Sequence, residues 1–342
     1  MKNKKLIKLI DSLIFDIKKI SKKISEPVFN NSEIKLLTSG IKQNSVSTYG
    51  RQVQIFENMA SKFLNTKNAI AISSGTSALH MALYALKVDN KCEILLPSTT
   101  FVATANSILY CNATPHFIDI SLEDLNIDTA KLENYLKIIK IVKNNKCFNK
   151  FTKKIIRAII PVHLYGNSAN LNEIIRISKK FKFDVVEDAA EAFGTKYNGR
   201  NVGTFGKIGI FSFNGNKLIT TGAGGLIVTK NKVIEKKIRH LISQSKIKKK
   251  FDIYSNELGF NLKMNALCAS LGIAQLKKIK KILKSKRKIF NYYKTKFKHS
   301  SEIKLICSKD KQIPNHWINT IMFKNINKKK RDYIFVFWVS VW

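Results

Sequence analysis

The sequence predicts an α/β protein with a mostly parallel sheet in a large domain and a smaller C-terminal domain. The 342 residues are 44% hydrophobic, which is enough to bury a large core. Between about residues 69 and 230, short apolar runs alternate with helical patterns, as in parallel strands joined by helices. Beyond residue 231 the chain turns lysine-rich and helical. We therefore expect an N-terminal helix and the large domain in residues 1–230, and the small domain in 231–342.

The apolar runs of this region are the expected strands. They are AIAIS (69–73), EILLP (93–97), PHFIDI (115–120), IIRAIIP (155–161) and FDVVED (183–188), followed by GIFSFNG (209–215) and GGLIVTK (224–230), which are compatible with a hairpin. The expected helices are TSALHMALYAL (76–86), FVATANSILY (101–110), NLNEIIRISKK (170–180) and a long segment over residues 266–293.

The net charge of +38 raises the question of a polyanionic partner, because a field of this sign attracts nucleic acids. Only seven of the 61 basic residues are arginine, the side chain that sites for bases and phosphates favour. Abundant lysine together with isoleucine and asparagine indicates compositional drift instead. We therefore expect no nucleic-acid partner.

The two ends of the chain carry apolar patterns that suggest no membrane span. Apolar residues from Leu6 to Ile20 recur at helical spacing, and Asp11 and Asp16 interrupt them as no secretory signal would allow. We expect a packed amphipathic helix there, with an interfacial membrane helix as the alternative. The apolar run 333–342 is half of the roughly 20 residues that a membrane span requires. Five cysteines without CxxC or metal-type spacing are typical of reduced thiols, so we expect a cytoplasmic protein without a metal site.

Three strand ends carry residues that suit one cofactor. Gly75 and Thr76 open a helix, where backbone N–H groups and a hydroxyl can bind a phosphate. Asp188 ends a strand, and its carboxylate can accept a hydrogen bond from a protonated ring nitrogen. Lys217 follows Ser212 and precedes a glycine cluster, and an enclosed amine is suited to Schiff-base formation. Each motif alone is compatible with a helix cap or a solvated lysine, but together they predict a site for pyridoxal 5′-phosphate.

With these motifs, the sequence resembles the DegT/DnrJ-type sugar aminotransferases, which use pyridoxal phosphate and have the aspartate aminotransferase (type I) fold. The similarity runs from about residue 26 to 330. EPVFNNSE, GRQVQIFE and SFNGNK most resemble the LegC-type branch, whose members aminate UDP-linked 2-acetamido-4-keto-6-deoxy hexoses. The matching segments are ISSGTSALHMAL (72–83), LLPSTTFVATANSILYCNATPHFIDI (95–120), PVHLYGNSANL (161–171), the region 185–229 and LGFNLKMNALCASLGIAQL (258–276).

The resemblance implies a role for each matching residue of the three motifs. Lys217 would form the Schiff base with the cofactor and shuttle protons. Asp188 would pair with the pyridine nitrogen. Gly75, Thr76 and Ser212 would hold the phosphate. Lys217 and Asp188 are thus the predicted catalytic residues.

Further roles follow from the same resemblance. Phe101 would stack on the cofactor ring, with core packing as the alternative. Glu191 would lie near the phenolic oxygen, where many members have Gln, with a solvated helix residue as the alternative. Asn261 would reach the phosphate of a neighbouring subunit, which implies a homodimer with shared sites. His163, at a strand end, is compatible with a substrate contact or a structural role, and His80 with packing, so both are left out of the catalytic set.

The predicted activity is transfer of an amino group, with glutamate as the expected donor, to C4 of a nucleotide-linked 4-keto-6-deoxy sugar. We expect a UDP-linked, N-acetylated sugar destined for surface polysaccharide or nonulosonic acid biosynthesis. A perosamine-type GDP-sugar 4-aminotransferase is one alternative, and a non-catalytic remnant or regulator is another. Dehydratases of the family carry His where this chain has Lys217, which argues against that activity.

The sequence departs from the family pattern at its C-terminus. Members continue for several tens of residues beyond the position of KKKRD, whereas here YIFVFWVSVW (333–342) follows and the chain stops. We expect a truncation or a change of reading frame that leaves the small domain incomplete. The aromatic, β-branched tail is also an aggregation risk. Cofactor binding is expected to survive this loss better than turnover, because the predicted cofactor residues lie upstream.

Overall fold

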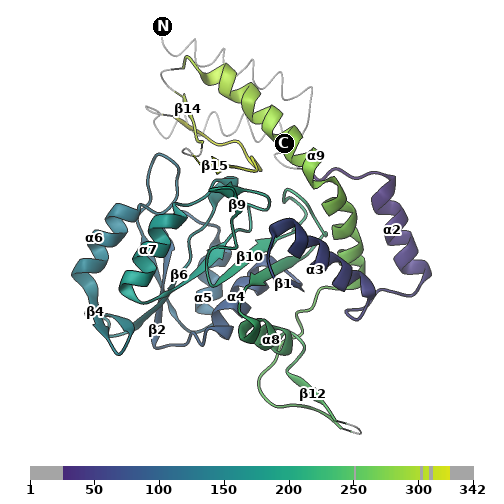
Figure 1. The fold of residues 1–342 in the computed structure, drawn as a ribbon, viewed down its shortest axis with the longest axis horizontal. Coiled ribbons are helices and arrows are strands. Elements are labelled where there is room, and N and C mark those ends of the chain that lie inside the picture. Colours follow the sequence, from purple (N-terminus) through teal and green to yellow (C-terminus); the bar gives the residue numbers. More distant parts are fainter. Residues whose placement is uncertain (1–25, 250–251, 301–302, 308–310, 324–342) are drawn as a thin grey trace.

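The structure is a computed structural model that describes residues 26–249, 252–300, 303–307 and 311–323 (Figure 1). The predicted N-terminal helix and the tail at 333–342 lie outside the described residues. No helix in the described parts of the chain is long and apolar enough to cross a membrane.

A nine-stranded sheet forms the centre of the molecule. Its main path runs in the order β1-β11-β10-β7-β6-β2-β3, and β4 and β5 extend it beside β6. The pairs from β10 to β3 along this path are parallel, whereas β11 is antiparallel to both β1 and β10. The strands are β1 (Asn68–Ile72), β2 (Cys92–Pro97), β3 (Thr114–Ile118), β4 (Lys140–Lys143), β5 (Lys146–Asn149), β6 (Ile155–Ile159), β7 (Asp184–Asp188), β10 (Ile208–Ser212) and β11 (Gly225–Thr229).

Helices cover both faces of this sheet (Figure 1). Ile70 and Ile72 of β1 face a core shared with α4, α5 and α8, whereas Ala69 and Ala71 face a core shared with α3 and α9, as the alternation of a strand requires. Helices α6 and α7 pack on β2, β6 and β7 in a third core. The helices are α2 (Asn31–Lys42), α3 (Arg51–Leu64), α4 (Gly75–Ala85), α5 (Val102–Leu109), α6 (Thr129–Ile139), α7 (Leu171–Phe181), α8 (Lys232–Leu241) and α9 (Ala266–Phe297), with a 3-10 turn η1 (Leu164–Gly166).

The predicted α/β class and mostly parallel sheet are confirmed. The seven expected strands and the four expected helices all form, with small shifts at their ends, and β10 and β11 pair as the expected hairpin. The prediction omitted α2, α3, α6 and the β4–β5 hairpin, among others. Leu132, Leu136 and Ile139 are buried along one side of α6, and Asp128 caps its start, so the helical pattern was present in the sequence.

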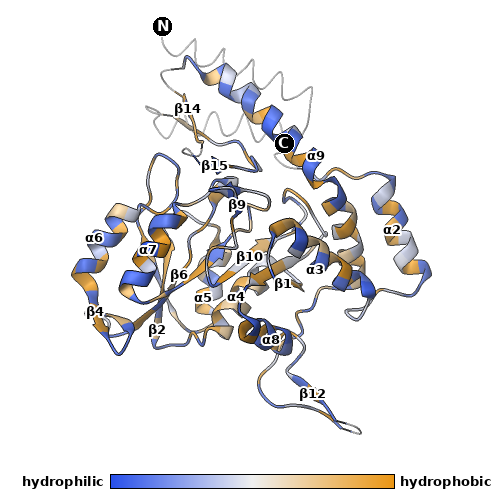
Figure 2. Ribbon diagram, in the orientation of Figure 1, coloured by the Kyte–Doolittle hydropathy of each residue, from blue (hydrophilic) through white to orange (hydrophobic). Residues whose placement is uncertain are grey.

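The chain after residue 230 packs against the part before it at several points. The first half of α9 packs against α2 and α3, and its second half is mostly hydrophilic (Figure 2). Strand β15 pairs with β8, which lies beyond β7 in the chain. The division of the chain near residue 230 stays a prediction. The short strands are β8 (Lys196–Tyr197), β9 (Arg200–Asn201), β12 (Lys246–Lys248), β13 (Ile253–Ser255), β14 (Ile303–Leu305), β15 (Gln312–Ile313) and β16 (Ile321–Phe323).

A buried carboxylate joins α2 to α9. Glu33 caps the start of its own helix by accepting from the N–H of Asn30 at 2.9 Å, and it accepts from Nε2 of Gln275 at 2.8 Å. Lys278 forms an ion pair with it. Burial alone would raise the pKa of Glu33, but the bonds from Lys278, Asn30 and Gln275 hold that pKa at about 2, below the ordinary 4.5.

This low pKa predicts a pH-dependent contribution to stability. The contribution is fully present above pH 4.5 and is lost as the pH falls through 4.5 towards 2. Glu33→Gln is expected to lower the free energy of unfolding at pH 7 by about 1–3 kcal/mol, because it leaves buried donors without their charged acceptor. The loss should be smaller at pH 3.5. Urea unfolding of both proteins at the two pH values measures this difference.

Glu173→Gln is the matched control, because Glu173 forms a half-exposed ion pair with Arg176. Such pairs contribute about 0–1 kcal/mol, so this change should have little effect at either pH. Equal losses for Glu33→Gln at pH 7 and pH 3.5 would contradict the assigned pKa.

Candidate active site

The start of α4 presents free backbone N–H groups. Ser74 caps the helix, since its Oγ accepts from the N–H of Ser77 at 3.0 Å and its carbonyl accepts from Ala78 at 3.0 Å. No acceptor among the described residues bonds the N–H groups of Gly75 and Thr76, as expected for the first turn of a helix. These two groups and the helix dipole can bind an anion.

Close packing brings Ser212 and β11 against this helix start. A Cβ atom on Gly75 would lie 2.8 Å from Cβ of Ser212, so only glycine permits this approach. Gly225 pairs with Ser212 across β10 and β11, and a Cβ on Gly225 would lie 2.5 Å from the carbonyl oxygen of Ser74. The structure therefore brings together the predicted phosphate residues Gly75, Thr76 and Ser212.

Asp188 lies at the carboxyl end of β7 with 4% of its surface exposed. Its Oδ2 accepts from Oγ1 of Thr104 at 2.7 Å, and its Oδ1 accepts from the N–H of Ala190 at 3.1 Å. Burial raises the pKa of Asp188, and the two hydrogen bonds and the charge of Lys217 oppose that rise. Thr104 was not predicted from the sequence. The signal available was a hydroxyl one turn into the helix that Phe101 precedes.

Lys217 and Glu191 form the second charged part of the site. Lys217 follows β10, and its Nζ lies 3.5 Å from Oε1 of Glu191. Oε2 of Glu191 accepts from the N–H of Tyr165 at 2.7 Å. Burial raises the pKa of Glu191, and the charge of Lys217 lowers it. Since Lys217 also acts electrostatically on Asp188, the three predicted residues share one site.

A segment near the end of the described chain, which was not predicted from the sequence, completes this site. The ring of Trp317 lies over Lys217, with 4.1 Å between Nζ and the ring centroid. Its Nε1 donates to the carbonyl of Asn216 at 2.8 Å. Asn315 is fully buried and donates to the carbonyls of Glu191 and Phe193 at 2.9 and 3.1 Å. An aromatic and an amide in PNHW (314–317) were the only sequence signal.

Two predicted residues lie at the surface of this part of the molecule. Phe101 precedes α5 and is 66% exposed, one turn before Thr104. Asn261 is exposed and forms an isolated bridge with Ser243. Its neighbour Leu262 accepts from the N–H of Ser73, just before the start of α4. Their predicted contacts with the cofactor and with a second subunit stay predictions.

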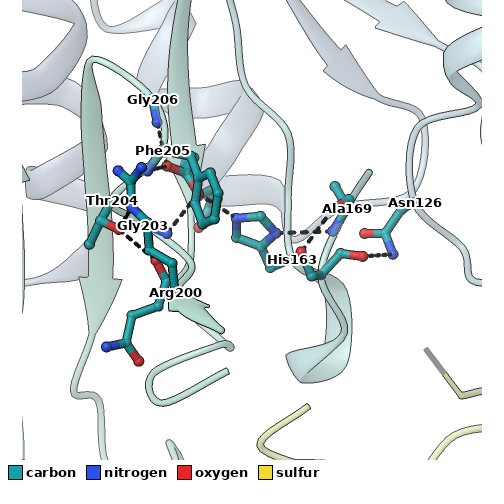
Figure 3. A network of polar contacts seen from close by, with 12 residues as sticks. Asn126, His163, Ala169, Arg200, Gly203, Thr204, Phe205 and Gly206 are labelled. Atoms are coloured by element: carbon teal, nitrogen blue, oxygen red, sulfur yellow. Dashed lines mark hydrogen bonds and ion pairs between the residues drawn. The ribbon is translucent and has the colours of Figure 1, made fainter. Parts of the chain in front are cut away.

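His163 has a structural environment and is fully buried. Its Nδ1 accepts from the N–H of Ala169 at 3.1 Å, so the proton resides on Nε2, which lies 3.1 Å from Oε2 of Glu187 (Figure 3). The carboxylate of Glu187 also accepts from the N–H groups of Gly203, Phe205 and Gly206. These contacts favour the structural alternative for His163.

His80 lies in an aromatic cluster. Its ring makes edge contacts with the rings of Tyr84, Tyr110 and Phe260, and burial lowers its pKa. This environment agrees with the predicted packing role.

The residues present fit the cofactor predicted from the sequence. Free N–H groups at the start of α4, with the hydroxyl of Ser212 beside them, suit its phosphate. The buried carboxylate of Asp188 suits its ring nitrogen. The partly enclosed amine of Lys217 suits its aldehyde.

Comparisons with known proteins place the chain among aminotransferases. The model of the DegT/DnrJ/EryC1/StrS aminotransferase family matches residues 27–338. The putative pyridoxal phosphate-dependent aminotransferase EpsN of Bacillus subtilis is 35% identical over 88% of this chain and 75% of its own length.

Two other relatives and one solved structure are similar to the chain. The UDP-4-amino-4,6-dideoxy-N-acetyl-beta-L-altrosamine transaminase of Campylobacter jejuni is 35% identical over 88% of this chain and 72% of its own. The GDP-perosamine synthase of Escherichia coli O157:H7 is 32% identical over 90% and 79%. Helicobacter pylori PseC, an aminotransferase involved in the biosynthesis of pseudoaminic acid, has a TM-score of 0.78 and 26% identity over 90% and 78%. The narrower resemblance to the LegC-type branch stays a prediction.

The hydrogen bond from Thr104 to Asp188 predicts a loss of cofactor affinity in Thr104→Val, which keeps the shape and removes the hydroxyl. We expect the Kd for pyridoxal phosphate to rise about 10–100-fold, because a hydrogen bond to a charged group is worth about 1.5–3 kcal/mol. Thr104→Ser retains the donor and should stay close to the unaltered protein. Absorbance titration of the apo protein measures both constants, and equal affinity for Thr104→Val and Thr104→Ser would contradict this role.

Proposed function

The chain belongs to the DegT/DnrJ/EryC1/StrS aminotransferase family, and on that basis we propose that it aminates C4 of a nucleotide-linked 4-keto-6-deoxy sugar with glutamate as the donor. Membership of this family makes it a pyridoxal-phosphate-dependent aminotransferase. The proposal rests on one observation: Lys217, Asp188 and Glu191 lie together beyond the ends of β7 and β10, beside the start of α4, whose free N–H groups suit an anion.

Each residue has a distinct task in this proposal. When bound, pyridoxal phosphate supplies an electron sink that stabilises negative charge on the carbon next to the donor nitrogen. Asp188 holds negative charge at the ring nitrogen, with Thr104 fixing its orientation. Lys217 would carry a proton between the donor carbon and the cofactor carbon, and general acid–base help of this kind is worth about 10²–10⁴-fold. Glu191 keeps the amine of Lys217 in place when it is free.

The relatives support a nucleotide sugar as the substrate, and they favour two nucleotides. The Campylobacter jejuni transaminase carries a UDP-linked, N-acetylated amino sugar in its name. We therefore propose a UDP-linked sugar. The perosamine synthases, at 32–34% identity, support the GDP-linked alternative.

We further propose that two copies of the chain share their sites. Asn261 is exposed and is linked through Leu262 to the strand end before α4. In the proposed homodimer this amide donates to the phosphate held by the other copy. The exposure of Asn261, next to the residue that bonds Ser73, is what supports this assignment.

The substrate proposal predicts the outcome of an assay with UDP- and GDP-linked 4-keto-6-deoxy sugars and glutamate, read by the mass of the amino product. We expect kcat/KM at least about tenfold higher for the UDP-linked N-acetylated sugar, because a site that hydrogen-bonds one substrate discriminates against an analogue that leaves those groups unpaired. Preference for the GDP-linked sugar would establish the alternative. Bound cofactor without any amino product would contradict the proposed activity.

Replacement of the catalytic amine gives a second outcome. Lys217→Arg keeps the positive charge but lacks a nucleophilic amine, so turnover should fall by at least about 10²–10⁴-fold. Lys207→Arg is the control, because Lys207 pairs with Asp184 at the opposite end of β7. Retained turnover in Lys217→Arg would exclude Lys217 as the proton carrier.

A further inference from the structure

The indole ring of Trp317 and the carboxylate of Glu191 flank the amine of Lys217. The Nζ atom lies 4.1 Å from the ring centroid and 3.5 Å from Oε1 of Glu191. An ammonium is attracted to the negative face of an indole ring, more strongly where water is excluded. The side chain of Lys217 is only 15% exposed, so the contact is largely desolvated.

Trp317 is fixed on three sides, and one of these contacts is to the loop that carries Lys217. Its ring Nε1 donates to the carbonyl of Asn216, the residue before Lys217, at 2.8 Å. Its N–H donates to Oδ1 of Asn315 at 2.9 Å, and its carbonyl accepts from Lys286 at 3.1 Å. The indole ring and the loop that carries Lys217 are therefore held in a fixed relative position.

Asn315 also fixes the position of the segment that carries Glu191. Its side-chain amide donates to the carbonyl of Glu191 at 2.9 Å, and its backbone N–H donates to Oγ1 of Thr195 at 3.0 Å. The segment that positions Trp317 thus also positions the backbone of the carboxylate on the other side of the amine.

Unusual backbone conformations occur where these segments meet. Tyr165, whose N–H bonds Glu191, has a φ of 55°, and His316, between Asn315 and Trp317, has a φ of 52°. Gly166 has a φ of 89°, and a Cβ there would lie 1.9 Å from Oδ1 of Asn315. Such conformations persist only where the surroundings enforce them, and they cluster at functional sites.

We propose that Trp317 is a positioning residue for Lys217. The indole ring of Trp317 holds the ammonium of Lys217 against Glu191 and keeps the free amine directed at the cofactor site. The proposal rests on the proposed function, since it needs Lys217 to be the cofactor lysine. The charged groups near this amine are the carboxylates of Glu191 and Asp188. Burial and the charge of Glu191 raise the pKa of the Tyr165 phenol, and Lys286 donates to the backbone carbonyl of Trp317.

The test must separate this role from simple packing, because Trp317 also belongs to a hydrophobic core. Progressive fluorination of tryptophan weakens the negative face of the indole and leaves its shape nearly unchanged. The readout is the pH dependence of the rate at which the full-length apo protein captures pyridoxal phosphate at Lys217. Only the neutral amine attacks the aldehyde, with loss of water, and the ring stabilises the charged amine. Each added fluorine should therefore lower the midpoint, the pH at which the capture rate is half-maximal, by about 0.5–1.5 pH units over the whole series.

Two controls isolate Trp317. The chain has two other tryptophans, Trp338 and Trp342, so Trp317→Phe protein with the same fluorinated residues should show no dependence on fluorination. Phe193→Leu removes a ring of the same core that packs on Phe63 and Phe213 instead, and its midpoint should equal that of the unaltered protein.

A midpoint that stays constant through the series would overturn the proposal, and so would an equal trend in the Trp317→Phe background. If the unaltered protein captures the cofactor at Lys217 with such a constant midpoint, only the role of Trp317 fails. Capture at a different lysine would overturn both this inference and the proposed site.

Discussion

Two adjacent buried carboxylates at the end of β7 require hydrogen-bond donors, and the rest of the site supplies them. Glu187 is fully buried and Asp188 is 4% exposed, and a buried charge is costly unless donors surround it. Because neighbouring residues of a strand point to opposite faces, donors are needed on both sides of the sheet. His163 and the N–H groups of Gly203, Phe205 and Gly206 donate to Glu187 (Figure 3). Thr104 and Ala190 donate to Asp188.

The two carboxylates have different roles: Glu187, on one face of the sheet, is structural, and Asp188, on the other face, is part of the candidate active site. Glu187 accepts from four donors and is saturated, so it anchors the strand end. Asp188 faces the start of α5 and lies within the electrostatic reach of Lys217. The parallel neighbours of β7 end at the same edge, which is where ligands bind in sheets of this kind. The returning segment of Asn315 and Trp317 then encloses the amine.

The sequence predicted the parts of the site that depend on local pattern. Apolar runs located the strand ends, and the strand ends located Gly75, Asp188 and Lys217. Contacts between distant segments were not predictable, because periodicity does not say which loop returns to which strand. Thr104 bonds Asp188 across 84 positions, and Asn315 bonds Glu191 across 124. The turn at Tyr165, with its positive φ, likewise depends on tertiary contacts.

The central claim is that one amine among 54 lysines is set apart by its surroundings. Borohydride reduction of the protein loaded with pyridoxal phosphate, followed by peptide mass spectrometry, tests this claim most directly. We expect a single modified peptide with the cofactor on Lys217. Modification of another lysine, or a label spread over the exposed lysines, would contradict the account.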